Sequence, residues 1–201
     1  MVGWGEVKTL SNQFDTMAAP LRHHRFTLDE YEEMLARGIL TSDDRVELLA
    51  GEIIEKVTIG SRHGACVDKL NRFFSLALGD RAIVRVQGPV ALPPDSCPEP
   101  DLAILRPCED FYAGAHPRPD DVLLAIEVSE SSLDFDRKVK LPIYAAAGIR
   151  EARIVEIADA TIECHSDPRN GVYAKTRLFR RGETFTAGAL PDVRLSVDAA
   201  V

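Results

Sequence analysis

Apolar residues recur with two different periods along this chain of 201 residues. Helical spacing predicts helices over residues 28–37, 62–78 and 134–147, and a glycine follows each of them. The first helix begins with a capping box, in which Thr27 is followed three residues later by a glutamate. Pro142 lies inside the third helix and is expected to kink or shorten it.

Shorter apolar segments predict β-strands over residues 45–50, 52–57, 82–87, 101–106, 122–128, 152–157, 161–166 and 172–179. The first two flank a glycine and predict a hairpin. Strand 122–128, helix 134–147 and strand 152–157 form a β-α-β unit, so part of the sheet is expected to be parallel. We therefore predict an α/β fold, a mixed β-sheet flanked by helices.

Composition limits the organisation and the location of the protein. The length suits one domain, which we place over residues 25–201, after a flexible N-terminal arm over residues 1–24. No segment approaches the roughly 18 apolar residues of a membrane span, and the N-terminus lacks the pattern of a secretory signal. We expect a cytoplasmic protein with no membrane contact. Its four cysteines lack zinc-site spacing and are expected to be free thiols.

The net charge of −8 argues against a protein that coats nucleic acid nonspecifically, because such proteins are normally basic. It does not exclude an enzyme whose carboxylates bind a metal ion and whose basic residues line a single groove. The charge therefore weakens the case for nucleic acid without removing it.

The apolar strand 122–128 contains one acid, Glu127. Burial of an ionised carboxylate costs several kcal/mol, roughly, unless a cation or hydrogen bonds compensate. Glu127 is therefore interpreted either as a metal ligand or as the partner of Arg137 or Lys138 in an ion pair. Asp101 opens another apolar strand, and its alternative role is that of a turn or strand-end residue.

Each of these acids has an alanine two positions away on its own strand face, which leaves room for an ion and its waters. Mg²⁺ prefers oxygen ligands and usually takes one or two carboxylates together with water and phosphate. Asp101 and Glu127 supply that number, and the backbone carbonyl of Val128 is a candidate third ligand. An ion held there would polarise a phosphoryl oxygen and lower the pKa of a bound water, and Mn²⁺ is expected to substitute for Mg²⁺.

Lys140 is the candidate to hold the attacking water or to neutralise charge on a phosphate. It shares one face of the predicted helix with Asp136 and Tyr144. Near a metal ion its pKa is expected to fall, and the alternative is a solvated charge on the helix. Glu47 is a fourth candidate, or else a solvent-facing residue of an edge hairpin. His63 either approaches the same cleft or is an ordinary residue at a helix start.

Together these segments resemble a known family, the Uma-type restriction endonucleases of the PD-(D/E)XK nuclease superfamily. The segments are Pro100–Leu105, Ala125–Leu133, Asp136–Tyr144 and Ala147–Glu151, supported by Phe26–Tyr31, Val46–Ile53 and His63. The resemblance covers residues 25–180. It implies a restriction-endonuclease-like core and Mg²⁺-dependent hydrolysis of phosphodiester bonds.

The same resemblance assigns roles to individual residues. It implies that Asp101 and Glu127 are metal ligands, that Glu47 is the upstream acid and that Lys140 is the lysine. The chain departs from the superfamily pattern at Ser129, which stands where the E-x-K motif has its lysine. In this branch the lysine typically comes from the next helix, a position that Lys140 fills.

The leading hypothesis is a DNA endonuclease in which basic side chains such as Arg62, Lys69, Arg72 and Arg137 hold the DNA. A homodimer is expected, because cutting both strands usually needs two sites. Two alternatives stay open. One is a catalytically inactive protein with a nuclease fold that acts in binding or assembly, and the other is a metal-dependent hydrolase of a different phosphoester.

Overall fold

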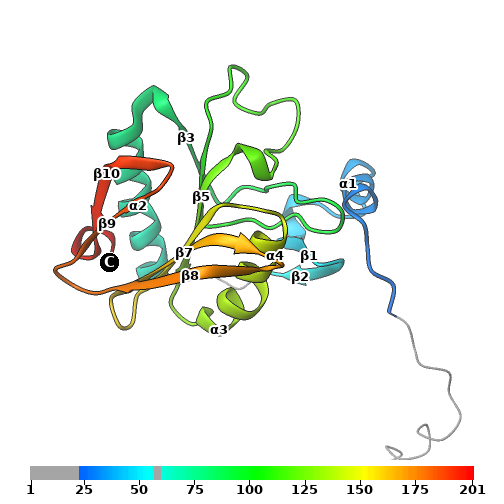
Figure 1. Cartoon of the computed structure of the whole chain (residues 1–201). Helices are drawn as coiled ribbons and strands as arrows, with labels where there is room; N and C mark the ends of the chain where they lie inside the picture. The colour runs from blue at the N-terminus through cyan, green and yellow to red at the C-terminus, as the bar shows by residue number, and fades with distance from the viewer. Residues whose placement is uncertain (1–22, 57–59) are drawn as a thin grey trace, which may run out of the picture.

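A six-stranded mixed β-sheet forms the centre of the protein in the computed structural model, which describes residues 23–56 and 60–201 (Figure 1). The strand order is β3-β4-β5-β6-β7-β8. The strands are β3 (Ile83–Val86), β4 (Leu102–Leu105), β5 (Val122–Ser129), β6 (Glu151–Glu156), β7 (Thr161–Arg169) and β8 (Val172–Phe179). Only β5 and β6 pair in parallel, while the other neighbours within this sheet are antiparallel.

Two hairpins and several helices accompany the sheet. The hairpins are β1 (Val46–Leu49) with β2 (Glu52–Glu55), and β9 (Thr184–Ala187) with β10 (Leu190–Ser196). The helices are α1 (Leu28–Ala36), α2 (Ser61–Leu78), α3 (Leu133–Phe135), α4 (Leu141–Ala146) and α5 (Val197–Ala200), and the shorter turns are η1 (Ser42–Asp44), η2 (Gly79–Arg81), η3 (Pro119–Asp121) and the π-helical turn η4 (Asp136–Lys140).

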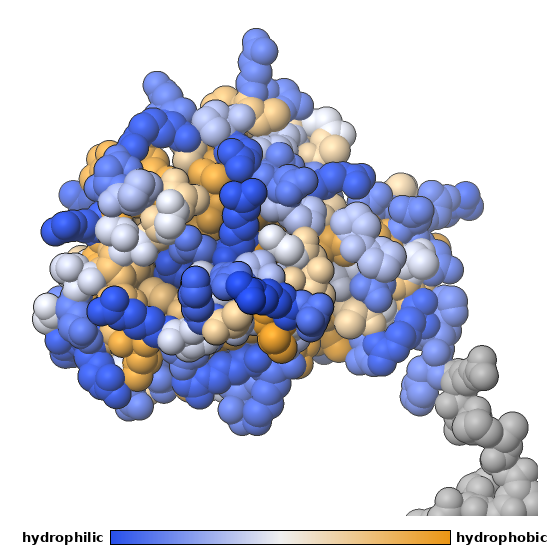
Figure 2. Space-filling model, viewed as in Figure 1, coloured by the Kyte–Doolittle hydropathy of each residue, from blue (hydrophilic) through white to orange (hydrophobic). Residues whose placement is uncertain are grey.

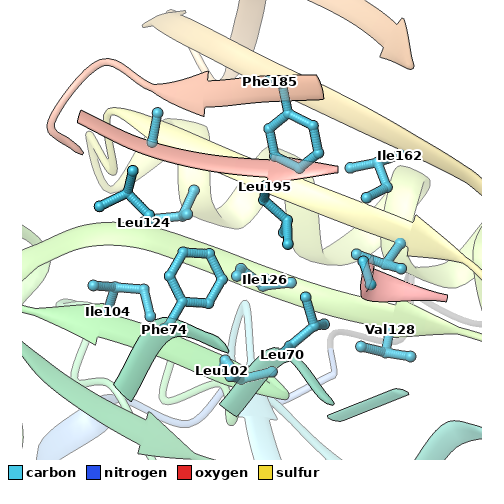
Figure 3. Packing of buried hydrophobic residues seen from close by; sticks show 14 of the residues in the cluster. Leu70, Phe74, Leu102, Ile104, Leu124, Ile126, Val128, Ile162, Phe185 and Leu195 are labelled. Atoms are coloured by element: carbon cyan, nitrogen blue, oxygen red, sulfur yellow. The ribbon is translucent and has the colours of Figure 1, made fainter. Parts of the chain in front are cut away.

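The two faces of the sheet carry different layers. On one face α2, the β9–β10 hairpin and α5 enclose an apolar core in which Phe74, Ile126 and Leu195 meet (Figure 3). The other face is covered by α4, whose Leu141 and Tyr144 pack with residues of β4, β5 and β6. Strand β5 is buried on both faces, as its apolar sequence predicts.

The mixed sheet flanked by helices confirms the predicted fold class. The predicted helices and strands are present with small differences at their ends, and β5 and β6 are parallel as the β-α-β unit requires. The capping box is also present. Thr27 Oγ1 accepts a hydrogen bond from the Glu30 N–H at 3.2 Å, and the Glu30 carboxylate accepts one from the Thr27 N–H at 2.8 Å.

The segment predicted as one helix over residues 134–147 consists of α3, the π-helical turn η4 and α4 in succession. Pro142 has no N–H to donate to a preceding carbonyl, and the N–H of Leu141 reaches back five residues to the Asp136 carbonyl. The proline therefore coincides with a widened turn, and the chain continues as a helix beyond it.

The β9–β10 hairpin and α5 were not predicted. Strand β9 has only four residues, and β10 contains a proline and two charged side chains, so neither shows a strong apolar run. Their apolar residues become buried only against α2 and the sheet, which are distant in the sequence. Of the flexible arm expected over residues 1–24, residues 1–22 lie outside the described part of the chain, as does the end of the predicted strand at residue 57.

Two expectations from composition concern the cysteines and the membrane. The four cysteines are free thiols, as predicted. Among the helices of residues 23–56 and 60–201, none is both long and apolar enough to cross a membrane.

Candidate active site

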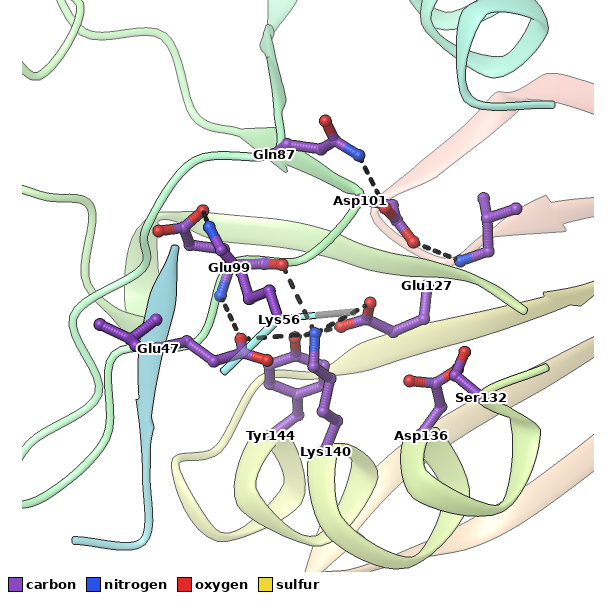
Figure 4. A network of polar contacts seen from close by, with 12 residues as sticks. Glu47, Lys56, Gln87, Glu99, Asp101, Glu127, Ser132, Asp136, Lys140 and Tyr144 are labelled. Atoms are coloured by element: carbon purple, nitrogen blue, oxygen red, sulfur yellow. Dashed lines mark hydrogen bonds and ion pairs between the residues drawn. The ribbon is translucent and has the colours of Figure 1, made fainter. Parts of the chain in front are cut away.

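Lys140 lies at the centre of a buried polar cluster on the α4 side of the sheet (Figure 4). Its Nζ is 3.3 Å from Glu127 Oε2 and 3.4 Å from Glu47 Oε2, and it also faces the carbonyl oxygen of Glu99 at 3.5 Å. The π-helical turn buries Lys140 together with Asp136, and Tyr144 follows on the same face. The alternative interpretation of Lys140 as a solvated helix charge is therefore wrong.

Glu127 is held on both carboxylate oxygens. Lys140 contacts Oε2, and the Tyr144 hydroxyl donates a hydrogen bond to Oε1 at 2.5 Å. The ion pair predicted with Arg137 or Lys138 is wrong, because these side chains pair with Glu163 and Asp134 respectively.

Burial raises the pKa of Glu127 to about 8. The positive charge of Lys140 opposes this rise, whereas the negative charges of Asp101 and Asp136 add to it. Glu127 therefore lies within electrostatic reach of both aspartates. A further positive charge near them would lower this pKa again.

Lys140 keeps its charge despite its burial. Desolvation disfavours the ammonium form, but Glu127 and Glu47 outweigh it and hold the pKa of Lys140 above its usual value. These contacts raise the pKa, so the fall expected near a metal ion stays a prediction.

Asp101 precedes β4 and reaches the carboxyl end of β5. Its Oδ2 accepts a hydrogen bond from the Val128 N–H at 2.8 Å and lies 3.1 Å from His63 Nε2, while Oδ1 faces the Gln87 amide nitrogen at 3.2 Å. The hydrogen bond to Asp101 raises the pKa of His63. The structure thus places His63 beside Asp101, so it is more than an ordinary residue at a helix start.

The backbone of Val128 is directed toward Asp101 through its N–H. In a β-strand the N–H and the C=O of one residue point to the same side, so the Val128 carbonyl is oriented toward this side as well. Asp101 and Glu127 contact different protein groups, and none of the described side chains bonds to both.

Glu47 comes from β1 and is buried, which contradicts its alternative interpretation as a solvent-facing residue. Besides Lys140, its Oε2 accepts a hydrogen bond from the Glu99 N–H at 2.9 Å. The hairpin β1–β2 therefore closes one side of the cluster. Glu99 itself was not predicted as part of the site, and its carboxylate pairs with Lys56.

Asp136 is a further acid, which was predicted to share a helix face with Lys140 but was assigned no role. It is buried, and Ser132 Oγ donates a hydrogen bond to its Oδ2 at 2.8 Å. Burial raises its pKa, with the charge of Lys140 opposing. The signal that could have identified it is its spacing of four residues before Lys140.

Alanines line the sheet beside the two acids. Ala103, Ala125 and Ala152 form a row across β4, β5 and β6, and the buried Tyr144 belongs to the same cluster. The Tyr144 hydroxyl reaches Glu127. The room that the alanines were expected to leave for an ion and its waters stays a prediction.

The acids of the cluster offer oxygen atoms, the ligand type that hard cations prefer. Four carboxylates, those of Glu47, Asp101, Glu127 and Asp136, act on the single buried Lys140. In the described residues, no group of three or more histidine, cysteine, aspartate or glutamate side chains is arranged to hold a metal ion. Mg²⁺ needs only one or two carboxylates with water and phosphate, so Asp101 and Glu127 fit this ion by their chemistry.

Among the described residues, none of the basic side chains proposed to hold DNA forms an ion pair with an acid of this cluster. Arg62, Lys69 and Arg72 are exposed on α2, with Arg62 at 3.8 Å from Glu130. Arg137 is engaged by Glu163.

The fold is that of a nuclease-like α/β protein. Among solved structures, the chain is similar to a protein described as a putative nuclease belonging to DUF820 from Anabaena variabilis ATCC 29413, with a TM-score of 0.70 and 15% identity. The match covers 87% of this chain and 97% of that one. At this identity the likeness shows the fold alone. No curated protein matches the chain.

Residues 28–198 match the Uma2 family, which is described as "Putative restriction endonuclease". The chain belongs to this family, and the resemblance found in the sequence is confirmed.

Proposed function

We propose that this protein is a metal-dependent DNA endonuclease that hydrolyses phosphodiester bonds. Membership of the restriction endonuclease family and the nuclease-like fold support a nuclease. The observation that carries the proposal is the buried Lys140 between Glu127 and Glu47, next to Asp101. A lysine surrounded by acids at the ends of neighbouring strands suits charge stabilisation at a phosphate.

Asp101 and Glu127, with the carbonyl of Val128, would hold Mg²⁺, and Mn²⁺ would substitute for it. When bound, the ion supplies polarisation of a phosphoryl oxygen and a lowered pKa for a bound water. The excess of carboxylates over cations supports this assignment, because the mutual repulsion of Asp101, Asp136 and Glu127 is relieved by added positive charge.

The side chains of the site divide the remaining work. Lys140 presents a permanent positive charge that stabilises negative charge on a phosphate oxygen. Glu47 holds the Lys140 ammonium, and Tyr144 fixes the orientation of Glu127. His63 fixes the orientation of Asp101 through the contact between His63 Nε2 and Asp101 Oδ2.

DNA is the proposed substrate, and its backbone would be contacted by the exposed basic side chains of α2, which are those of Arg62, Lys69 and Arg72. A homodimer would place two such sites on the two strands of a duplex.

A second candidate function is a catalytically inactive binding or assembly protein with a nuclease fold. One observation favours it: Lys140 and Tyr144 already bond to both oxygens of Glu127. In addition, the described residues contain no group of three or more histidine, cysteine, aspartate or glutamate side chains arranged to hold a metal ion. On this alternative, the cluster is a polar part of the core, and the protein binds no divalent ion through Asp101.

Two measurements distinguish these candidate functions. Each is made on three proteins: the wild type, the variant Asp101→Asn and the control variant Asp134→Asn. Asp134 is an exposed acid on α3 that pairs with Lys138, so its substitution changes the net charge equally without touching the cluster. The measurements are nicking of supercoiled plasmid in Mg²⁺ or Mn²⁺ and calorimetric titration with Mn²⁺.

The endonuclease proposal expects nicking and Mn²⁺ binding in the wild type and in Asp134→Asn, and the loss of both in Asp101→Asn. Equal nicking by all three proteins would reject the assignment of the site. No nicking and no Mn²⁺ binding by the wild type would favour the inactive protein. Metal-dependent cleavage of a small phosphodiester without nicking of DNA would identify a hydrolase of another phosphoester.

A further inference from the structure

A groove separates strands β6, β7 and β8 from the β9–β10 hairpin, and its volume is about 680 Å³. Arg153, Cys164 and Arg177 are register neighbours across the three strands and lie along this groove. Cys164 packs against the core on the α2 side of the sheet, whereas Lys140 approaches from the α4 side. The groove is therefore a different place from the candidate active site.

Positive charge dominates the groove. Its charged lining consists of Arg153, Lys175, Arg177 and Arg194 with a single acid, Glu151. The chain as a whole has a net charge of −8, so this local excess of cations runs against the overall balance. Figure 2 shows strongly hydrophilic residues over the middle of this face, where β7 and β8 run in Figure 1.

Most of these cations lack an acid inside the groove. Among the described residues, no ion pair engages Arg177 or Arg194. Lys175 is 3.6 Å from Asp167, which is outside the lining of the groove. Only the charge of Arg153 is compensated within the groove, by Glu151 at 2.6 Å.

Arg153 is the buried cation of the groove lining. The residue is only 3% exposed, and its guanidinium donates to the Ala152 carbonyl at 3.0 Å, to Glu151 at 2.6 Å, and to the His165 and Thr186 carbonyls at 3.4 Å. Its Nε is buried and has no hydrogen-bond partner among the described residues. Such unpartnered buried donors are rare in folded proteins, so the floor of the groove holds a cation whose donors are not all used.

We propose that this groove binds a small molecule that carries a phosphate group and has about the size of a mononucleotide. The planar N–H fork of arginine matches the oxygen geometry of phosphate, and Arg177 and Arg194, which have no ion-pair partner among the described residues, both line this groove. The hydroxyl groups of Ser166 and Thr176 add neutral donors. The volume falls within the range of about 300–1,000 Å³ that small-molecule sites occupy.

A small ligand suits the groove better than a DNA duplex. A duplex presents a long row of phosphates and gains affinity from many cations along its path. The cations here are confined to one groove of an otherwise acidic chain. This inference does not depend on the proposed nuclease function, because the groove shares no residue with the Lys140 cluster.

The test is calorimetric titration of the full chain with deoxyadenosine monophosphate, inorganic phosphate and deoxyadenosine. The variants are Arg194→Gln and the double substitution Arg177→Gln with Arg194→Gln, both at exposed positions. Arg118→Gln is the matched control, because Arg118 is exposed and lies outside the groove. Circular dichroism verifies that each variant is folded.

We expect the monophosphate and inorganic phosphate to compete for one site, and deoxyadenosine not to bind. Each lost arginine contact should weaken binding about tenfold, so the double variant should lose more than Arg194→Gln and Arg118→Gln should match the wild type. Absence of phosphate binding at about 10 mM would overturn the proposal, and so would equal affinity in all variants. Binding of a short DNA duplex through Arg177 and Arg194 without binding of the monophosphate would also overturn it.

Discussion

The two faces of the central sheet bury cations in opposite surroundings. On the α4 side, four carboxylates act on one buried lysine, Lys140. On the other side, four cations and one carboxylate line the groove that contains the buried Arg153. Folding alone does not require either imbalance, because a buried charge is most easily tolerated when one partner neutralises it. The proposed divalent cation and the proposed phosphate would each neutralise one of these excesses.

A third group, in which a buried glutamate and a buried histidine meet an exposed arginine, is the balanced case. Arg137 pairs with Glu163, and His165 Nε2 is 3.0 Å from Glu163 Oε2. One cation and one carboxylate meet with a neutral imidazole, so no charge is left over. These three residues, called the Arg137 cluster, are the internal reference for the Lys140 cluster and the groove.

The largest effect is expected from Lys140→Met, which removes the cation and leaves the buried Glu47 without its charged partner. We expect the free energy of unfolding to fall by about 3–5 kcal/mol, because a broken buried ion pair leaves uncompensated charge. Urea denaturation at neutral pH measures this change. If the acid excess is a cation site, added Mn²⁺ should stabilise this variant more than the wild type.

Lys138→Met is the control for this substitution. Lys138 lies two residues away in the same turn, but it is exposed and pairs with an exposed acid, so its replacement should leave the unfolding free energy close to that of the wild type. Similar unfolding free energies for the wild type and Lys140→Met would contradict the account of the cluster.

The fold could be predicted from the sequence because its signals are local or periodic. The apolar run of β5, the capping box before α1 and the β-α-β order each depend on residues close together in the chain. The β9–β10 hairpin escaped prediction because its few apolar residues are buried by partners far away in the sequence.

The site was only partly predictable for the same reason. The positions of Glu127 and Lys140 on a strand and the next helix follow from periodicity, and the structure brings these two side chains together. The contact of Glu47 with the Glu99 N–H and that of His63 with Asp101 join residues 52 and 38 positions apart, which no spacing rule indicates. The π-helical turn, which buries both Asp136 and Lys140, was also beyond helix periodicity.

An intermediate effect is expected from acid on the balanced Arg137 cluster. Burial lowers the pKa of His165 below its ordinary value of 6.5, with Glu163 opposing and Arg153 and Arg137 adding to the decrease. In the unfolded chain the imidazole takes up its proton at a higher pH than in the folded protein. The stability that the neutral imidazole provides is therefore complete above pH 6.5 and is lost as the pH falls through the lowered pKa.

One proton changes the slope of the unfolding free energy against pH by at most about 1.4 kcal/mol per pH unit. His165→Gln should make the unfolding free energy fall less steeply below pH 6.5, as measured by urea denaturation at several pH values. The Thr176 hydroxyl, which lies 3.0 Å from His165 Nδ1, is a neutral neighbour, so Thr176→Val should keep the steep pH dependence. Identical slopes for the wild type and His165→Gln would show that other groups control acid sensitivity.

The smallest effect is expected in the groove, where Arg194→Gln removes one of four cations. Because the position is exposed, we expect a gain in stability of about 0.5 kcal/mol or less, through reduced repulsion from Arg177 and Lys175. The gain should be larger at low ionic strength, where the repulsion between charges is screened less. Thermal unfolding at two salt concentrations, with Arg118→Gln as the control, measures it.

Phosphate should reverse this order of stability. A ligand that binds only the folded protein stabilises it, and at a given concentration the stabilisation increases with the logarithm of its affinity. Wild type therefore gains more from added phosphate than Arg194→Gln and should become the more stable of the two. If Arg194→Gln instead unfolds at a lower temperature without phosphate, the arginine contributes favourable contacts of its own, and the contrast between the two faces of the sheet is then smaller than the charges suggest.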